Sequence, residues 1–338
     1  MSEVSEQLHD LSAKGGVLRR MQLVAESAML HYDVDPSSSV TLLNVSENAT
    51  FLVEGSQGKR VIRVHRLGYH SGAEILSELI WLEALRTDEG IKTPEVITSR
   101  HGERVVYIES GSERRHCVMF DFVEGRELAP SNAREGFVTL GELAARMHRH
   151  ARKWNIPSSF KRFSWDLGAS FGEGARWGRY EDGIDVDHEL TELLERVEST
   201  IRRRLFIYGQ DPSRFGLIHA DMRLSNLLWD DSGEVCVIDF DDSGFGWFFY
   251  DLASALSFIE HRPEVSDLIG AWMEGYRNYG TISKVDEDEI HSFIMMRRLL
   301  LVSWIGSHPI ASISQELGGE YSRQTAALAE EYLLRWNA

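Results

Sequence analysis

The sequence predicts an α+β protein in which a small strand-rich lobe precedes a larger, mainly helical lobe. Short runs rich in β-branched and aromatic residues fill residues 40–122, with one helical pattern inserted among them. Later in the chain, apolar residues recur at helical spacing. The two patterns meet at Phe122-Val-Glu-Gly125. We therefore expect a strand-rich N-terminal lobe over residues 1–121, a hinge over 122–126 and a mainly helical C-terminal lobe over 127–338.

Composition narrows the class of protein. The 338 residues include 36 Lys and Arg against 53 Asp and Glu, which gives a formal net charge of −17. This balance argues against a nucleic-acid partner, because domains that bind the phosphate backbone usually carry a basic stripe. Cys117 and Cys236 lie in apolar runs and are expected to be buried free thiols in a reducing compartment. The longest apolar run, Leu299–Ile305, is too short to cross a bilayer, and the N-terminus has no signal-peptide pattern. We expect a cytoplasmic protein without a membrane partner.

The N-terminal lobe is predicted element by element from periodicity and turn residues. Alternating or β-branched runs give strands, and apolar residues three and four apart give helices. A polar stretch with glycine at 56–59 is typical of a hairpin turn. The expected elements are a lead-in helix over 17–32, strands over 40–45, 50–54 and 60–65, a helix over 72–86, and strands over 96–99, 105–108 and 117–122.

The C-terminal lobe is predicted to be built mainly from amphipathic helices. A segment rich in Trp, Phe, Gly and Arg over residues 163–180 is expected to be irregular. The expected helices cover residues 138–152, 187–207, 247–259, 264–279, 286–305 and 321–336.

Oxygen-bearing side chains concentrate between residues 216 and 255. Asp221 is followed five positions on by Asn226, and Asp239 closes an apolar strand run at 235–238. Carboxylate and amide oxygens are ligands that Mg²⁺ prefers. A carboxylate on a loop can also receive the proton of a hydroxyl that attacks a phosphate. The residues therefore indicate phosphoryl transfer, with Asp221 as the base and Asn226 and Asp239 as catalytic metal ligands.

The same stretch resembles the aminoglycoside phosphotransferase/choline kinase-like family, which has the protein-kinase-like fold. The catalytic loop of that family reads His-Gly-Asp, four residues, Asn. His219, Ala220, Asp221 and Asn226 match this pattern, with alanine in place of the usual glycine. We assign His219 a structural role in this loop, because such a histidine more often stabilises the loop than transfers a proton.

Further matches extend the resemblance over roughly residues 38–330. The second metal-binding aspartate of the family falls on Asp239. Asp251, in Tyr-Asp-Leu-Ala, matches an aspartate that braces the catalytic loop from the following helix. The resemblance implies a bilobal kinase fold and an ATP-dependent kinase that uses Mg²⁺ and phosphorylates a hydroxyl of a small molecule.

The resemblance also implies nucleotide contacts. The phosphate-contacting lysine of the family falls on Arg63, whose expected partner is Glu78, with Glu74 as the alternative. Arginine neutralises phosphate but is not interchangeable with lysine. Lys59 is expected in the hairpin turn, pointing to no fixed site. The remaining implied contacts are the carbonyl of Asp121 and the amide of Val123 for adenine, and the segment from Ser46 through Asn48 to Thr50 over the phosphates.

Three alternatives remain open. The run from Asp239 to Ser243 also resembles the nucleophile motif of haloacid-dehalogenase-type phosphatases, but the only lysine after it is Lys284. Arg63 motivates a nucleotide-binding pseudokinase. A Ser/Thr protein kinase of the same fold is disfavoured, because Gly246 and a helix follow too soon for an activation segment.

The acceptor is not identified by the sequence. Acidic residues near the catalytic loop would favour an amine-bearing acceptor, whereas arginines would favour an anionic one. The oligomeric state is also left open. The candidate acceptor contacts are Arg223, Trp247, Glu260, His261, Arg297, Trp304 and His308.

Overall fold

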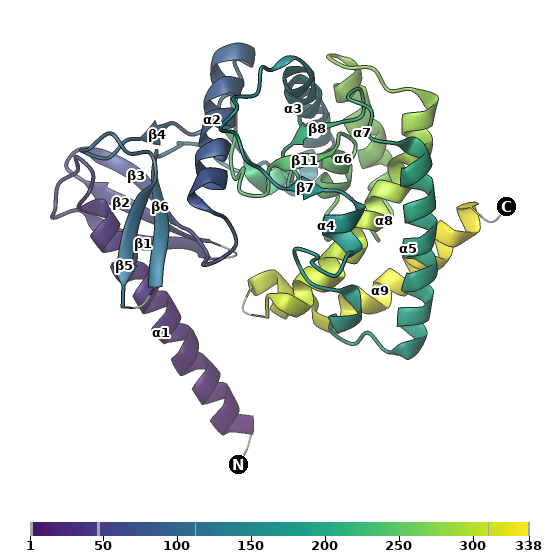
Figure 1. Ribbon diagram of the computed structural model, residues 1–338, viewed down its shortest axis with the longest axis horizontal. Coiled ribbons are helices and arrows are strands. Elements are labelled where there is room, and N and C mark those ends of the chain that lie inside the picture. Colours follow the sequence, from purple (N-terminus) through teal and green to yellow (C-terminus); the bar gives the residue numbers. More distant parts are fainter. Residues whose placement is uncertain (1–2, 46–47, 112, 310, 337–338) are drawn as a thin grey trace. The chain divides into compact units, whose positions relative to one another are not determined.

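The computed structural model describes residues 3–45, 48–111, 113–309 and 311–336. The chain divides into two compact units, which are described separately. Unit 1 comprises Met1–Glu83, Pro94–Glu124 and Ser159–Lys161. Unit 2 comprises Ala84–Thr93, Gly125–Ser158 and Arg162–Ala338 (Figure 1). The limits of the three predicted parts, including the hinge at 122–126, stay predictions.

Unit 1 contains a six-stranded antiparallel sheet with the order β1-β2-β3-β6-β4, in which β5 also pairs with β6. Each strand overlaps one of the expected runs. The strands are β1 (Ser39–Val45), β2 (Ala49–Gly55), β3 (Gly58–Val64), β4 (Val96–Ile97), β5 (Val106–Ser110) and β6 (Glu113–Asp121).

The β2–β3 hairpin turns at residues 56–57 and is closed by the pair Gly55 and Gly58. Gly58 has a φ of 96°, a conformation that favours glycine. The expected position of Lys59 is wrong, because this residue is the second of β3. Its ammonium lies 3.4 Å from the carboxylate of Glu124 and 5.1 Å from the ring of Phe122.

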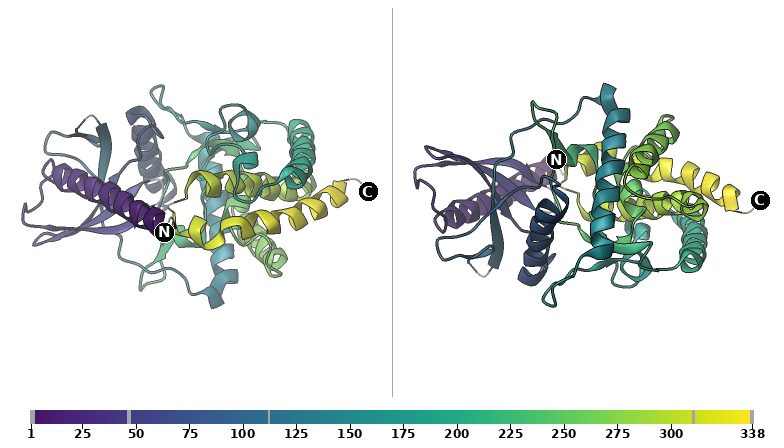
Figure 2. Two further views of the ribbon diagram at one scale, coloured as in Figure 1. Left: turned by 90° about the horizontal axis from the view of Figure 1, so that it is seen from below. Right: turned by 90° about the horizontal axis from the view of Figure 1, so that it is seen from above.

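Two helices accompany the sheet of unit 1. Helix α1 (Glu3–Met29) begins earlier and ends earlier than the expected 17–32, and it crosses one face of the sheet (Figure 2). The core on this face includes Ala28, Phe51 and Ile62, all at most 1% exposed. Side chains alternate along a strand, so Arg63 lies on the opposite face, where it meets helix α2 (Gly72–Glu89).

In unit 2, helix α8 packs against α5, α6 and α9, and its residues from Glu289 to Ile305 are mostly buried (Figure 1). Part of the segment expected to be irregular forms a short strand and a short helix instead. The helices are α3 (Ala133–Lys153), α4 (Leu167–Phe171), α5 (His188–Tyr208), α6 (Tyr250–Ala255), α7 (Val265–Arg277), α8 (Lys284–Ser307) and α9 (Ser312–Trp336).

Short strands in unit 2 anchor the segments that carry the predicted site. Strand β11 (Gly244–Trp247) pairs with β8 (Phe215–Ile218) and with β7 (Ser164–Trp165). Strand β9 (Leu227–Trp229) pairs with β10 (Val235–Val237). The expectation that a helix starts at 247 is wrong by three residues, because 244–247 is extended and α6 begins at Tyr250.

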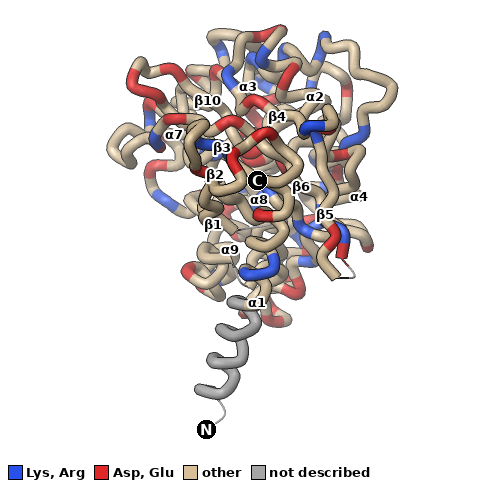
Figure 3. Tube along the Cα trace, turned by 90° about the vertical axis from the view of Figure 1, so that its left-hand side faces the viewer, with Lys and Arg blue, Asp and Glu red and all other residues tan. Residues whose placement is uncertain are grey.

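The surface and the thiols agree with the composition. Figure 3 shows Lys and Arg interspersed with Asp and Glu along the chain. Cys117 and Cys236 are both free and buried, as expected. Among the described residues, we find no helix that is long and apolar enough to cross a membrane.

Candidate active site

The site is built on the loop between β8 and β9. Ala220 has a φ of 65°, the left-handed conformation that costs an L-residue about 1–2 kcal/mol. Asp251, on α6, stabilises this turn through its carboxylate. Its Oδ1 accepts the N–H of Ala220 at 2.7 Å, and its Oδ2 accepts the N–H of His219 at 3.2 Å. Asp251 therefore braces the catalytic loop through two backbone amides.

A buried histidine of α3 holds the carboxylate of Asp251 in place. His148 Nε2 lies 2.9 Å from Asp251 Oδ2, and Nδ1 lies 3.1 Å from the hydroxyl of Tyr276. The imidazole also stacks on Phe248, with 4.6 Å between ring centroids. Burial lowers the pKa of His148, although the neighbouring Asp251 acts in the opposite direction. The sequence placed His148 near the end of a helix and gave no sign of this role.

The carboxylate of Asp221 is held by three side chains. Arg223 Nε donates to Oδ1 at 3.1 Å, and its Nη2 donates to Oδ2 at 3.1 Å. Arg297, on α8, donates from Nη2 to Oδ1 at 2.8 Å. Asn226 donates from Nδ2 to Oδ2 at 3.0 Å and to the main-chain oxygen of Asp221 at 2.8 Å. Both carboxylate oxygens are therefore fully engaged.

Charge explains why Asp221 stays ionised although it is buried. Burial alone would raise its pKa, but Arg223 and Arg297 outweigh this effect, and the pKa lies below its ordinary value of 3.8. In turn, Asp221 raises the pKa of Arg223, and Asp239 contributes to the same shift. Both carboxylates therefore stabilise the charged form of the Arg223 guanidinium.

The two predicted metal ligands are tied to each other through the backbone of Ile238. The carbonyl of Asn226 accepts the N–H of Ile238 at 2.9 Å, and His219 Nε2 lies 3.1 Å from the carbonyl of Ile238. His219 Nδ1 accepts the N–H of Asp221 at 3.3 Å. The next residue, Asp239, is exposed and has a φ of 60°. The loop and the residue after β10 are thus joined through both backbone groups of Ile238.

The side-chain oxygens of Asn226 and Asp239 are suited to Mg²⁺ that is bound together with a nucleotide. The described residues form no cluster of three His, Cys, Asp or Glu side chains that could hold a metal by itself. Because Nδ2 of Asn226 donates to Asp221, its Oδ1 is the atom left to bind a cation. Mg²⁺ is usually held by one or two carboxylates together with substrate phosphates. Asn226 and Asp239 match that oxygen-only donor set.

Unit 1 contains the expected pair of Arg63 and Glu78. Arg63 Nη2 donates to both carboxylate oxygens of Glu78, at 2.7 and 2.8 Å, and the two side chains are 8% and 1% exposed. The guanidinium also lies 5.3 Å from the ring centroid of Phe120. The alternative partner, Glu74, instead accepts from the N–H and the hydroxyl of Ser71.

The other predicted nucleotide contacts have varied surroundings. Asn48 is buried, and its Oδ1 accepts the N–H of Arg66 at 3.0 Å. The N–H of Asp121 donates to Glu95 within the sheet. Ser46 lies outside the described residues, and Val123 stays a prediction.

Six of the seven candidate acceptor contacts fall into different environments. Arg223 and Arg297 bind Asp221 directly, as described above. Trp304 stacks on His308 at 4.7 Å between ring centroids. By contrast, Trp247 is 1% exposed, and its indole N–H donates to Gly209. Glu260 has a fully buried side chain that accepts from Arg298 at 2.8 Å. The structure therefore places Trp247 and Glu260 in the core and not at an acceptor surface.

One residue near the site gave no sequence signal. Phe258 has a φ of 71°, a strained conformation for an aromatic residue. Its half-buried ring lies 5.7 Å from the guanidinium of Arg223 and 6.1 Å from the ring of Trp304. Such strain clusters at ligand-binding sites. Phe258 thus continues the surface beside Asp221 with an aromatic face.

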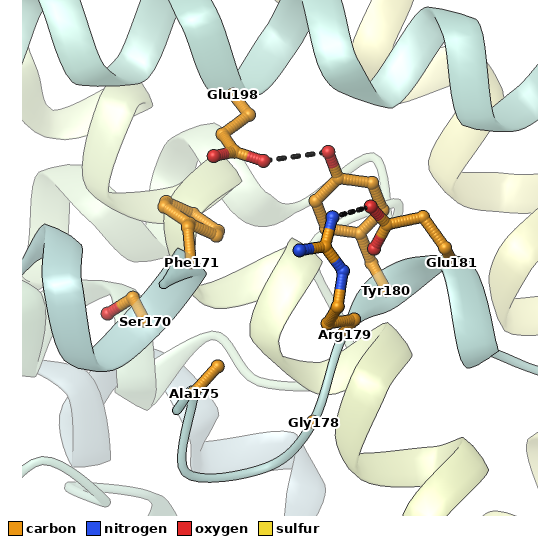
Figure 4. Close-up of a pocket in the computed structure, with 8 residues that line it drawn as sticks. All are labelled: Ser170, Phe171, Ala175, Gly178, Arg179, Tyr180, Glu181 and Glu198. Atoms are coloured by element: carbon orange, nitrogen blue, oxygen red, sulfur yellow. Dashed lines mark hydrogen bonds and ion pairs between the residues drawn. The ribbon is translucent and has the colours of Figure 1, made fainter. Parts of the chain in front are cut away.

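A separate small pocket lies beside α4 and α5, lined by Ser170, Phe171, Ala175, Gly178, Arg179, Tyr180, Glu181 and Glu198 (Figure 4). It has room for about one water molecule, far less than the roughly 300 Å³ at which ligand pockets usually begin. Most of its charged and hydroxyl groups pair with one another: the hydroxyl of Tyr180 donates to Glu198 at 2.7 Å, and Arg179 pairs with Glu181. None of its lining residues belongs to the predicted site.

The mostly buried, ionised Asp221, the oxygen-bearing Asn226 and Asp239, and the pair of Arg63 and Glu78 match the pattern expected of a kinase-type phosphotransferase. The sequence comparison agrees, because the model of the phosphotransferase enzyme family (APH) matches residues 40–287. The chain belongs to this family.

Similar proteins support the same class. The structure of a microcompartment-associated aminopropanol kinase is 44% identical, covers 92% of this chain and 97% of its own, and superimposes with a TM-score of 0.86. An amicoumacin kinase in complex with AMP-PNP, Ca²⁺ and Ami is 22% identical, covers 94% and 95%, and has a TM-score of 0.75. The amicoumacin kinase of Bacillus subtilis (strain 168) is 23% identical over 300 residues, 84% of each chain.

These findings decide several expectations. The predicted family, the α+β protein-kinase-like fold and the enzyme class are confirmed: the chain is a small-molecule phosphotransferase with a hydroxyl acceptor. Use of ATP and a divalent cation is confirmed for this class. Neither the protein kinase nor the pseudokinase alternative is favoured.

Proposed function

We propose that this protein transfers the γ-phosphate of ATP to the hydroxyl of a short amino alcohol of the aminopropanol type. The observation that carries this proposal is the 44% identity to an aminopropanol kinase over 92% of the chain. Other family members with different acceptors share far less sequence with it, as the 23% identity to the amicoumacin kinase illustrates. The acidic net charge of −17 is also suited to a cationic acceptor.

In the proposed reaction, the acceptor hydroxyl donates its proton to the carboxylate of Asp221. Its oxygen forms a bond to the γ-phosphorus while the bond from that phosphorus to the bridging oxygen of ADP breaks. Asn226 and Asp239 hold Mg²⁺, which neutralises phosphate charge when it is bound. Because the pKa of Asp221 is lowered, the carboxylate is ready to accept a proton throughout the physiological pH range.

The remaining predicted contacts complete the proposal for the nucleotide. Arg63, oriented by Glu78, contributes positive charge to the phosphates. The backbone of Asp121 and of Val123 binds adenine, and the segment with Ser46 and Asn48 covers the phosphates. These assignments rest on the resemblance to the family.

The acceptor is proposed to lie against the ring of Phe258, whose centroid lies 6.1 Å from that of the buried Trp304. An aromatic face attracts an ammonium group through its quadrupole, which contributes about 0.5–2 kcal/mol. The half-buried ring of Phe258 beside Arg223 brings such a face close to Asp221. We also place the activity in the cytoplasm, in keeping with the two free buried thiols, Cys117 and Cys236.

The test is a screen of ATP consumption over candidate acceptors. Purified protein with MgATP is supplied with 1-amino-2-propanol, ethanolamine, choline, homoserine, a sugar, an aminoglycoside or amicoumacin. Asp221→Asn serves as the blank. We expect the highest kcat/KM for a short amino alcohol. A preference for a sugar or an antibiotic, with no amino alcohol turned over, would reject the proposed acceptor but retain the enzyme class.

A further inference from the structure

Two consecutive arginines of α8 reach different parts of unit 2. Arg297 and Arg298 are both buried, with side chains 3% and 0% exposed. Arg298 binds Glu260, Thr325 and the carbonyl of Tyr321. Those contacts join helices within the core. Arg297 instead directs its guanidinium at the catalytic loop.

Among the described residues, the hydrogen bonds of Arg297 place its guanidinium against the catalytic loop, α6 and the turn that follows α6. Its Nε donates to Ser257 Oγ at 2.9 Å, and its Nη1 donates to the carbonyl of Ala220 at 3.2 Å and to the hydroxyl of Tyr250 at 3.3 Å. Nη2 is left for Asp221 Oδ1, at 2.8 Å. With four partners and almost no exposure, Arg297 has no room to move away.

Arg223 differs in both exposure and partners. Its side chain is 34% exposed, and its hydrogen bonds among the described residues all end on Asp221. Exposed charged side chains are held only weakly in one position. Arg223 can therefore leave Asp221 when a stronger anion is nearby, whereas Arg297 cannot.

The acceptor hydroxyl needs a free position on Asp221. A carboxylate offers about four lone-pair positions, and Arg223, Arg297 and Asn226 together occupy both oxygens. One donor must leave before the hydroxyl can bind. Asn226 also donates to the main-chain oxygen of Asp221, so it is fixed like Arg297.

We propose that Arg297 is a positioning residue, which holds the Asp221 carboxylate in its reactive orientation after Arg223 has transferred its contacts to the nucleotide phosphates. This inference rests on the proposed phosphotransferase reaction. It also reassigns Arg297, which was expected to contact the acceptor. Removing its guanidinium should slow the chemical step and leave acceptor binding unchanged.

The experiment compares Arg297→Lys and Arg297→Ala with Arg298→Lys as the matched control, all confirmed as folded by circular dichroism. Steady-state kinetics give kcat and KM for MgATP and for the acceptor. Arg297→Ala should lose about 10²-fold in kcat, the scale of a misplaced reacting group, with both KM values unchanged. Arg297→Lys should recover part of the loss. Arg298→Lys should keep wild-type kcat below its melting temperature.

Chemical rescue distinguishes positioning from a general structural effect. Millimolar guanidinium ion should raise kcat of Arg297→Ala several-fold and leave Arg298→Lys unchanged. The slow hydrolysis of ATP by water gives a second readout that needs no acceptor, so a wrong acceptor would not be mistaken for a failure of this inference. An increase in acceptor KM at constant kcat, or equal kcat losses at both arginines without rescue, would overturn it.

Discussion

Two contacts between arginine and carboxylate, one in each unit, are built differently. In unit 1, Arg63 meets Glu78 one to one, and the pair is neutral. In unit 2, two arginines share Asp221. The carboxylate of Glu78 thus fixes an arginine, whereas the arginines of unit 2 fix a carboxylate. The excess positive charge lowers the pKa of Asp221 and keeps its carboxylate ionised.

Asp221→Asn should give the largest effect and test the unit 2 half of this comparison. An amide cannot receive the acceptor proton, so kcat should fall by about 10²–10⁴-fold. Arg297 still finds an oxygen on asparagine, so the protein should fold and bind MgATP. A coupled assay for ADP and calorimetric titration of nucleotide measure the two quantities. Activity close to that of the wild type would show that Asp221 is not the base.

Arg63→Gln tests the contact of Arg63 with Glu78 in unit 1. It leaves the buried Glu78 carboxylate without its cation, which should lower the free energy of unfolding by about 3–5 kcal/mol. Arg60→Gln is the control on the same strand, because the pair of Arg60 and Asp121 is 32% and 45% exposed and such pairs contribute about 0–1 kcal/mol. Urea unfolding measures both. Equal losses in the free energy of unfolding would mean that burial does not make the pair of Arg63 and Glu78 more stabilising than the exposed pair.

The stability that His148 contributes through its contact with Asp251 should depend on pH. The pKa of His148 in the folded protein lies below its ordinary value of 6.5. The unfolded chain therefore binds a proton first as the pH falls, so the stability contributed by neutral His148 is present above pH 6.5 and is lost below it. Urea unfolding between pH 7.5 and 5 should show a weaker dependence for His148→Gln than for the wild type. The same slope in both proteins would contradict this assignment.

Ala220→Gly should give the smallest effect. Glycine relieves the left-handed strain but costs about 0.5–1 kcal/mol of backbone entropy, so the two terms nearly cancel. Ala220→Val, in contrast, should destabilise strongly, because a β-branched residue is an outlier at this φ. Thermal melting of the two variants measures the difference. A large loss with glycine would show that the Ala220 side chain matters more than its conformation.

Features local in sequence were predictable. The periodicity gave the order of strands and helices, and the spacing of Asp221 and Asn226 is a short-range pattern that one loop satisfies. The resemblance to the family implied the pairing of Arg63 with Glu78, with Glu74 as the alternative, and these residues lie on a strand and the helix after it. In each case, the residues that act together lie within a few elements of one another.

Features that depend on packing were not predictable. Arg297 reaches Asp221 from a helix far along the chain, and no periodicity indicates which face of a buried helix meets a loop. Trp247 and Glu260 were expected near the acceptor, but both are satisfied inside the core. The left-handed conformation of Phe258 has no sequence signal, because bulky residues rarely adopt it.

Helix α8 also constrains how such enzymes can be recombined. One stretch of it supplies both a core contact, through Arg298, and a partner of Asp221, through Arg297. A chimera that imports the C-terminal helices of a relative to change acceptor choice would also replace the residue that orients the base. Such a graft should be active only where the donor sequence provides an arginine at the position of Arg297.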